Sequence, residues 1–203
     1  MKKSPNKTGL RVKGVAASPG ISIGRAHVME EFEVIASGVL LKDDEIFAEI
    51  EKFDVAVRVS VDEVEATKNN PALKEEEIEI LEAHIEFLTD PQIKTEVIAK
   101  ISQHKKNVTD SVIEVIQAAV QVFKNMEGEY MRARASDVQD IGNRILKNLN
   151  HSPPSSFQKL ELNTIIVADD ISPSDAIAMN MNQVVGFATR VGGKTSHTAI
   201  LAK

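Results

Sequence analysis

The sequence of 203 residues contains no cysteine and no tryptophan, and only one tyrosine. Without cysteine the chain cannot use thiol catalysis, a disulfide framework or cysteine-based metal sites. Aromatic residues make up 4% of the chain, which argues against stacking platforms for single-stranded nucleic acid. The net charge of -6 also argues against a general nucleic-acid-binding protein.

Long apolar runs are missing as well. No stretch approaches the roughly 18 apolar residues that cross a bilayer, and the N-terminus lacks the apolar core of a signal peptide. We therefore expect no membrane span and a cytoplasmic location. Hydrophobic residues at 42% and charged residues at 27% are typical of a soluble globular protein, and the length allows one large domain or two small ones.

Proline and glycine are scarce between Asp43 and Asn148, where each occurs only twice. Apolar residues in this stretch recur at steps of three and four, which predicts amphipathic helices with solvated charged faces. The stops at Pro71, Pro91 and Gly128 divide the pattern further. We expect a helical bundle with short connections, its five helices covering about residues 46–68, 72–88, 91–101, 107–127 and 129–149.

The two ends of the chain carry strand patterns. Leu10–Ala16 and Ile21–Met29 predict two strands around a turn at Ala17–Gly20, as a hairpin or an arch. Near the other end, Asn163–Ala168 and Gln183–Thr189 predict two further strands.

Between those later strands, Ser172-Pro173-Ser174-Asp175 is a strong helix start, with a capping serine, a proline and an acid in the favoured positions. Residues 150–158 are rich in serine and proline and indicate a linker. We therefore expect the two ends to form one α/β domain, with the bundle inserted between them.

The last twelve residues, 192–203, read GGKTSHTAILAK. The glycines permit a tight turn, and Thr195 or Ser196 can cap a helix that holds His197 in its first turn. A helix N-terminus attracts anions, and a neutral imidazole can attack a phosphoryl group. The pattern predicts a phosphohistidine at His197, with Gly193, Thr195 and Ser196 supporting the phosphate. A histidine after two glycines is also often a capping or packing residue.

Residues 192–203 also allow comparison with three other kinds of site: a P-loop, a hydrolase and a non-catalytic module. A P-loop is excluded because Ala188 stands where its first glycine is needed. A hydrolase using Ser196 or Thr195 with His197 as base is unfavourable, because adjacent residues at a helix start point in different directions and the Gly-x-Ser-x-Gly elbow is missing. A non-catalytic helical interaction module, with an inert His197, stays open from the residues alone.

Four stretches carry a family resemblance: residues 14–21 (GVAASPGI), 80–88 (ILEAHIEFL), 134–142 (RASDVQDIG) and 192–203. They resemble Enzyme I of the bacterial phosphoenolpyruvate:sugar phosphotransferase system. The related dikinases share the histidine loop but not the helical motifs, and are the alternative. The resemblance implies an α/β phosphohistidine (swivelling) domain made of residues 1–38 plus 152–203, C-terminally truncated here, with a helical HPr-binding domain at 39–151.

The resemblance also implies a function. His197 would accept a phosphoryl group from phosphoenolpyruvate on its Nε2 atom and pass it to the phosphocarrier HPr for sugar uptake. The matching positions for docking HPr are Glu75, Glu76, Phe87, Met131 and Arg134.

The chain departs from the family at several positions. Ala176 replaces a threonine whose hydroxyl helps to hold the active histidine, Glu86 replaces an apolar residue, and Pro91 replaces an acid. In the family a barrel domain follows, which binds phosphoenolpyruvate and Mg²⁺ and forms the homodimer. We therefore expect an N-terminal fragment without a metal site, unable to use phosphoenolpyruvate alone.

Overall fold

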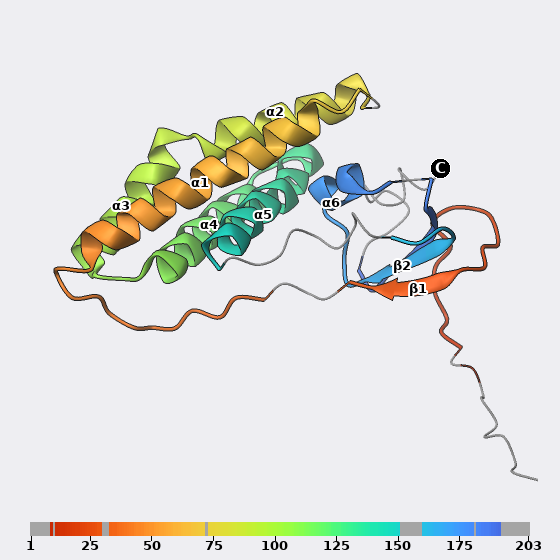
Figure 1. Cartoon of the computed structure of the whole chain (residues 1–203), viewed down its shortest axis with the longest axis horizontal. Helices are drawn as coiled ribbons and strands as arrows, with labels where there is room; N and C mark the ends of the chain where they lie inside the picture. Colours follow the sequence, from red (N-terminus) through yellow and green to blue (C-terminus); the bar gives the residue numbers. More distant parts are fainter. Residues whose placement is uncertain are drawn as a thin grey trace, which may run out of the picture.

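The computed structural model describes residues 9, 11–29, 33–71, 73–150, 160–180 and 182–191. Most of this part of the chain is helical (Figure 1). Five consecutive helices, which we call the bundle, are α1 (Ile46–Lys68), α2 (Glu75–Leu88), α3 (Pro91–His104), α4 (Val108–Asn125) and α5 (Glu129–Leu149). The five helices predicted from the apolar periodicity are confirmed.

Local chemistry sets several helix ends. The Asp90 carboxylate accepts a hydrogen bond of 2.7 Å from the backbone N–H of Gln92, and Pro91 occupies the first helical position of α3. At the end of α3, Lys105 adopts the left-handed conformation with φ of 53°. The side chain of Asn107 then caps α4 by accepting a bond of 2.9 Å from the N–H of Asp110. These caps explain why α3 and α4 are separate helices.

The core of the bundle lies among all five helices. α4 packs along α5, and α1 contacts both α2 and α5. A Cβ atom at Gly142 would lie 2.5 Å from Cγ2 of Ile116, so α5 needs glycine there to approach α4 closely. The most deeply buried apolar side chains are Phe53, Val64, Leu81, Val97, Ile101, Val112, Val115, Ile116 and Ile145.

A small parallel sheet is built from distant parts of the sequence. Its strands are β1 (Arg25–Val28), β2 (Thr164–Ala168) and β3 (Val184–Thr189), in the order β1-β2-β3. The helix α6 (Pro173–Ala178) connects β2 to β3 and begins as predicted, with the Ser172 hydroxyl accepting a bond of 3.1 Å from the N–H of Asp175. We call β1, β2, α6 and β3 the sheet unit.

One glycine allows β1 to pair with β2. A Cβ atom at Gly24 would lie 2.1 Å from the carbonyl oxygen of Asn163, which no other residue could tolerate. Asn163 itself has a φ of 62°, and its carbonyl accepts a hydrogen bond of 3.0 Å from the N–H of Arg25. The parallel register then aligns Arg25 with Thr164 and Val28 with Val167.

The predicted N-terminal hairpin is wrong. Residues 11–16 form no strand and are exposed, with both Val12 and Val15 at 81%. β1 is shorter than the predicted Ile21–Met29 strand and pairs with β2, in parallel. The alternation of residues 11–16 was a misleading signal, because its apolar side chains have nothing to pack against among the described residues.

The expected fold class, an α/β phosphohistidine domain interrupted by an inserted bundle, is also wrong. The bundle helices contain 14 to 23 residues each, whereas the strands contain only 4 to 6. The described chain is a mostly helical structure that carries a small parallel sheet. The physical reason is that the apolar stripes of α1–α5 bury one another in a large core, while β2 buries only alternate residues.

The sheet unit and the bundle meet at α6, which lies beside α5 (Figure 1). Ile177 of α6 packs against the apolar core of the bundle. The segment between β1 and α1 is also attached to the bundle, because the N–H groups of Ser37 and Gly38 each donate a bond of 2.8 Å to the carboxylate of Asp110. The chain therefore enters α1 from a segment fixed to the start of α4.

Candidate functional site

The residues that follow β3, at the carboxyl edge of the sheet, connect it to the glycine turn predicted at residues 192–193. Beyond the end of β3, the N–H of Arg190 donates to the carbonyl of Ala168 at 3.1 Å, and the N–H of Val191 donates to that of Asp169 at 2.9 Å. Arg190 also binds the Asp169 carboxylate through two nitrogens, with 2.6 Å between Nη2 and Oδ2. These hydrogen bonds lower the pKa of Asp169. The backbone is thus held against β2 up to Val191.

The predicted phosphohistidine site begins just after this point. His197, Gly193, Thr195 and Ser196 lie outside the described residues, so their roles stay predictions. The carboxyl edge of a parallel sheet is the usual place for ligand sites in open sheets of this kind. The described part of the chain therefore ends at an edge of the sheet where a phosphate site is expected.

Ala176 lies in α6, where the resembled family usually has threonine. Its side chain is 6% exposed and belongs to a cluster of apolar residues between α6 and β2, together with Leu160, Ile166 and Met179. The methyl group of Ala176 therefore contributes to packing inside the sheet unit.

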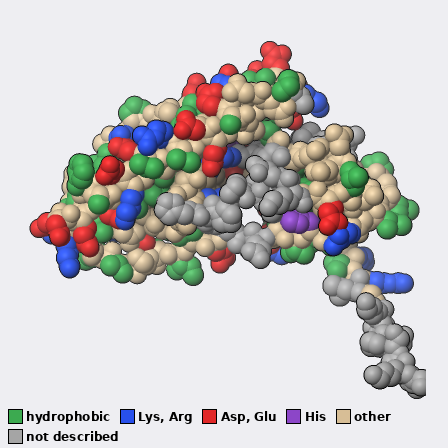
Figure 2. All heavy atoms as spheres, in the orientation of Figure 1, with side chains coloured by type: hydrophobic (Ala, Val, Ile, Leu, Met, Phe, Trp, Pro, Cys, Tyr) green, Lys and Arg blue, Asp and Glu red, His purple; other side chains and the backbone are tan. Residues whose placement is uncertain are grey.

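The predicted docking residues lie on two neighbouring helices. Glu75 and Glu76 are exposed in the first turn of α2, at an end of the bundle where acidic side chains gather (Figure 2). Phe87 is half-buried about 18 Å further along α2, at 1.5 Å per residue, and packs on the bundle core. Met131 and Arg134 are half-buried in the first turns of α5, which contacts α2.

A polar cluster between α2 and α5 was missed by the sequence reasoning. His84 of α2 is 1% exposed, and this burial lowers the pKa of its imidazole, while the negative charges of Asp140 and Asp137 oppose the shift. Asp137 accepts a hydrogen bond of 3.1 Å from Nη1 of Arg134. The signal that could have found the cluster is the place of His84 on the apolar face of α2, three residues after the buried Leu81.

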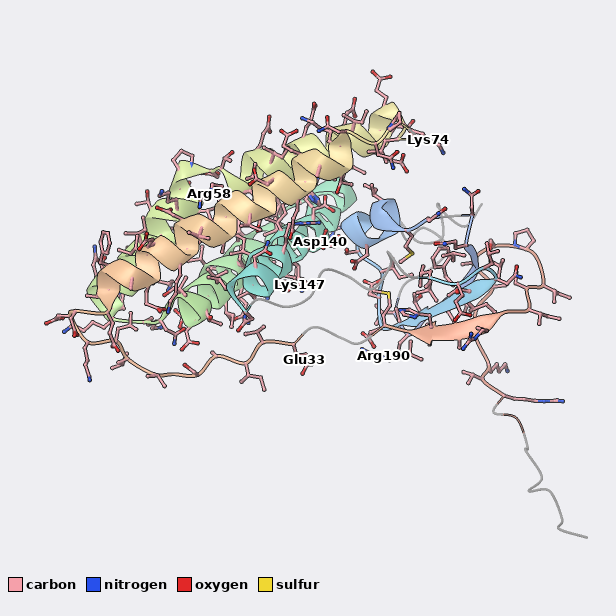
Figure 3. All side chains as sticks on the ribbon, in the orientation of Figure 1. Glu33, Arg58, Lys74, Asp140, Lys147 and Arg190 are labelled. Atoms are coloured by element: carbon pink, nitrogen blue, oxygen red, sulfur yellow. The ribbon has the colours of Figure 1, made fainter. Side chains whose placement is uncertain are left out.

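The cluster extends to α6 through Asp140. Asp175 of α6 has a raised pKa, first because it is buried and second because of the negative charge of Asp140. Lys147 and Arg144 oppose this shift with their positive charges. Figure 3 labels Asp140 and Lys147 on α5, where that helix runs beside α6. The charge of Asp140 on α5 therefore acts on both His84 of α2 and Asp175 of α6.

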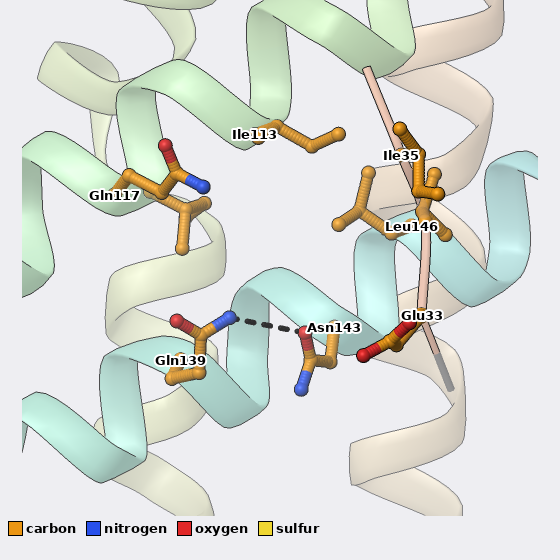
Figure 4. A pocket seen from close by; sticks show the side chains of 9 residues that line it. Glu33, Ile35, Ile113, Gln117, Gln139, Asn143 and Leu146 are labelled. Atoms are coloured by element: carbon orange, nitrogen blue, oxygen red, sulfur yellow. Dashed lines mark hydrogen bonds between the residues drawn. The ribbon is translucent and has the colours of Figure 1, made fainter. Parts of the chain in front are cut away.

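Two hollows lie elsewhere on the bundle. A pocket of about 340 Å³ lies between α4 and α5, where Nε2 of Gln139 donates a bond of 3.1 Å to Oδ1 of Asn143 (Figure 4). A larger groove of about 1150 Å³ runs along α1 and the start of α4. Neither hollow is lined by a histidine or by a predicted site residue, so neither supports phosphohistidine chemistry.

The described residues show neither a metal-binding cluster nor a membrane-spanning helix. Within residues 9–191, leaving out the undescribed gaps, no group of three or more metal-ligating side chains could hold a metal ion. The helices of this same part of the chain are too short or too polar to cross a membrane.

Two known protein families match this chain, one over its N-terminal part and one over its C-terminal part. The family of the PEP-utilising enzyme N-terminal domain matches residues 13–134, and that of the PEP-utilising enzyme mobile domain matches residues 160–203. A phosphoenolpyruvate-protein phosphotransferase of Bacillus subtilis is 36% identical and one of Haemophilus influenzae 30% identical, each over 95% of this chain and 34% of the relative. The chain thus spans about a third of the length of these relatives.

Solved structures agree with the mostly helical architecture. A solution structure of Enzyme I (nEIt) is 36% identical, with a TM-score of 0.81 over 95% of this chain and 78% of the other. The N-terminal domain of Enzyme 1 - Nitrogen shares the fold alone, at 21% identity and a TM-score of 0.65, over 91% of this chain and 76% of the other. The resemblance to Enzyme I drawn from the sequence is confirmed. This chain belongs to the PEP-utilising enzyme family, in which it matches the N-terminal part of Enzyme I.

Proposed function

We propose that this chain is the phosphoryl-carrying part of a phosphoenolpyruvate-protein phosphotransferase, with His197 as the phosphorylated residue. The observation that carries the proposal is the match of both family regions in one chain, because the second region, residues 160–203, includes His197. The described backbone, held against β2 up to Val191, supports it by leading to the carboxyl edge of the sheet.

The chemistry requires a neutral imidazole at His197. Its Nε2 lone pair attacks the phosphorus of phosphoenolpyruvate, an N–P bond forms, and the P–O bond to the enolate of pyruvate breaks. The enolate then takes a proton to give pyruvate. In the onward step a histidine nitrogen of the carrier attacks the phosphorus, and the N–P bond to His197 breaks. Gly193, Thr195 and Ser196 would support the phosphate through helix-start N–H groups.

We propose that residues 39–151 dock the carrier, an HPr-like protein, while residues 1–38 with 152–203 carry the phosphoryl group. The exposed carboxylates of Glu75 and Glu76 would attract a basic surface, with Phe87, Met131 and Arg134 supplying apolar contact and hydrogen bonds. Exposed Glu86 adds a charge where the resembled family has an apolar residue.

In this proposal, phosphoenolpyruvate binds to a region that corresponds to the part of the relatives outside the match, about two thirds of their length. Mg²⁺ would be bound there too, because the described residues contain no cluster that could ligate it. Dimer formation would use the same region, and the protein would work in the cytoplasm. We expect no phosphorylation when the chain is mixed with phosphoenolpyruvate and Mg²⁺ alone; labelling under those conditions would contradict this division.

The test of the proposal uses a phosphorylated HPr as donor. We expect phosphate that is labile in acid and stable in alkali to appear on the wild-type chain, and none on His197→Ala. HPr binding without transfer to the wild type would favour a non-catalytic interaction module, and label that survives His197→Ala would exclude His197 as the nucleophile.

The docking part has its own test. Reversing both charges in Glu75→Lys with Glu76→Lys should slow transfer from phosphorylated HPr about tenfold or more at low salt, because electrostatic steering is lost. The matched control is Asp43→Lys with Asp44→Lys, two adjacent exposed acids just before α1. An equally large effect of the control variant would show that Glu75 and Glu76 are not specific docking residues.

A further inference from the structure

Two connections leave the sheet at its carboxyl edge, and a side-chain ion pair joins them. One connection follows β2, begins with Asp169 and leads to α6. The other follows β3, begins with Arg190 and leads towards residues 192–203. Figure 3 labels Arg190 at the end of the sheet to which the strand arrows point. Nε and Nη2 of Arg190 donate to the two carboxylate oxygens of Asp169, with 2.6 Å between Nη2 and Oδ2, so the pair is bidentate.

Backbone hydrogen bonds hold the same two segments together. The N–H of Arg190 donates to the carbonyl of Ala168 at 3.1 Å, and the N–H of Val191 donates to the carbonyl of Asp169 at 2.9 Å. Successive N–H groups of a regular strand point to opposite sides, so two successive donors to one neighbour show that the chain turns here. Both donors lie in a bend beyond β3. These two bonds and the ion pair therefore set the direction in which the chain leaves the sheet.

Asp169 is the fixed member of the pair. It directly follows Ala168, the last residue of β2, and Ile171 is 3% exposed in the apolar cluster of the sheet unit. α6 then begins with the hydroxyl of Ser172 as its cap. The side chain of Asp169 is 29% exposed, whereas that of Arg190 is 73% exposed. A connection that is anchored on both sides thus offers a carboxylate to the chain that follows β3.

The pair restrains position more than it stabilises the fold. An ion pair as exposed as this one contributes little to the free energy of folding. Two side-chain bonds and two backbone bonds nevertheless fix the backbone at Val191, six residues before His197. Attack on a phosphorus atom depends on the placement of the attacking nitrogen, and small displacements of a reacting group lower the rate steeply.

We propose that Asp169 and Arg190 are positioning residues for phosphoryl transfer at His197. The pair holds the start of the glycine turn against the end of β2, and it thereby limits the positions that the imidazole can take. This inference rests on the function proposed above for His197. It adds two residues that belong neither to the phosphohistidine motif nor to the predicted docking surface, and neither side chain needs to touch the phosphoryl group.

The test measures the rate of phosphate transfer from phosphorylated HPr to the chain over a range of HPr concentrations. Arg190→Ala and Asp169→Ala should each lower the rate at saturating HPr about tenfold, because the imidazole is less well placed. The HPr concentration that gives half the maximal rate should not change, because the predicted docking residues lie on α2 and α5. The matched control is Arg25→Ala, which breaks an exposed pair with Glu161 at the amino edge of the sheet and should transfer as the wild type does.

The double variant decides whether the two residues act as a pair. Asp169→Ala with Arg190→Ala should be no slower than either single variant, because each change alone already breaks the pair. Hydrogen exchange gives a second readout that needs no phosphate donor. The amide proton of Val191 should exchange faster in all three variants than in the wild type, while the amide protons of β2 keep their protection and show that the sheet is intact.

Three results would overturn the inference: a wild-type rate in Arg190→Ala, a wild-type rate in Asp169→Ala, or losses that add in the double variant. If Arg190 acted through its charge directly on the phosphoryl group, Asp169→Ala would stay fast, which is the second of these results. A wild-type chain that takes up no phosphate from HPr is a different outcome. It would refute the function proposed for His197, and the positioning role with it.

Discussion

The bundle and the sheet unit are built from contacts of different range along the sequence. The helices α1–α5 follow one another without interruption between residues 46 and 149, and they pack on sequence neighbours such as α4 on α5. In the sheet unit, β1 at residues 25–28 pairs with β2 at residues 164–168, so the whole bundle lies between partners in the sequence. Closing so long a loop costs entropy that local helix contacts do not cost.

The two regions also differ in how completely they cover their apolar surface. Phe53, Val64 and Ile101 of the bundle are at most 2% exposed, whereas β1 is an edge strand whose Val28 is 67% exposed. From this difference we expect the bundle to contribute most of the free energy of folding of this chain. The sheet unit, which leads to the proposed phosphohistidine, is held by a smaller core and by its contact with α5.

The largest expected effect is in the bundle core. Phe53→Ala should lower the free energy of unfolding by about 3–5 kcal/mol, because a fully buried aromatic side chain leaves a cavity. Phe47→Ala on the same helix is the control and should change it by less than about 0.5 kcal/mol, since Phe47 is 77% exposed. Urea denaturation followed by helical circular dichroism measures both. Similar losses in the two variants would show that the bundle core is assigned wrongly.

A matching change in the sheet unit separates the two regions. Ile166→Ala removes a side chain that is 0% exposed and should cost about 2–5 kcal/mol of local stability. We expect amide protons of β2 and β3 to lose protection against hydrogen exchange, while those of α4 and α5 keep theirs. Equal loss of protection in both regions would mean that they unfold as one cooperative unit.

Gly142 tests the closest helix packing of the bundle. Gly142→Ala should lower stability by about 1–3 kcal/mol, even though alanine favours helices by about 1 kcal/mol, because the new Cβ would overlap Ile116. In the Ile116→Ala background the same substitution should cost much less, since Cγ1 and Cγ2 are gone. Thermal melts of the four proteins give the coupling. Additive effects would argue against the close approach of α4 and α5.

The smallest expected effect is a pH dependence caused by His84. Burial lowers the pKa of its imidazole in the folded state, so below pH 6.5 the unfolded chain takes up a proton that the folded chain does not. The free energy of unfolding should therefore rise with pH towards 6.5, by at most about 1.4 kcal/mol per pH unit. His84→Gln should flatten this slope in urea titrations between pH 5 and 7.5. An unchanged slope would mean that other groups cause it.

The sequence predicted the bundle and the strands β2 and β3 well, but it did not predict the pairing of β1, for a physical reason. Apolar residues such as Phe53 and Val57 repeat at helical spacing within one helix, and caps such as Asp90 act on their nearest neighbours, so both signals are local. The pairing of Arg25 with Thr164 depends on residues that are far apart, and nothing local distinguishes it from the hairpin predicted for residues 10–29. The pattern around Val12 and Val15 predicts a strand, yet neither side chain is buried.

The candidate site shows the same limit. The glycine turn and His197 were recognisable as a motif, but they lie outside the described residues and their geometry stays a prediction. The sequence could indicate only that His84 is buried. It could not assign Asp140 and Asp175 to the same cluster, because the three residues come from three helices that only the folded chain brings together.

The central claim is that His197 alone carries the phosphoryl group. The chain contains five histidines, His27, His84, His104, His151 and His197, so locating the phosphate among them tests the claim directly. After transfer from phosphorylated HPr, mass spectrometry under alkaline conditions should find one phosphate, on His197, and ³¹P NMR should show it on Nε2. Phosphate on any of the other four histidines, or an unmodified His197 in a chain that carries label, would contradict the account.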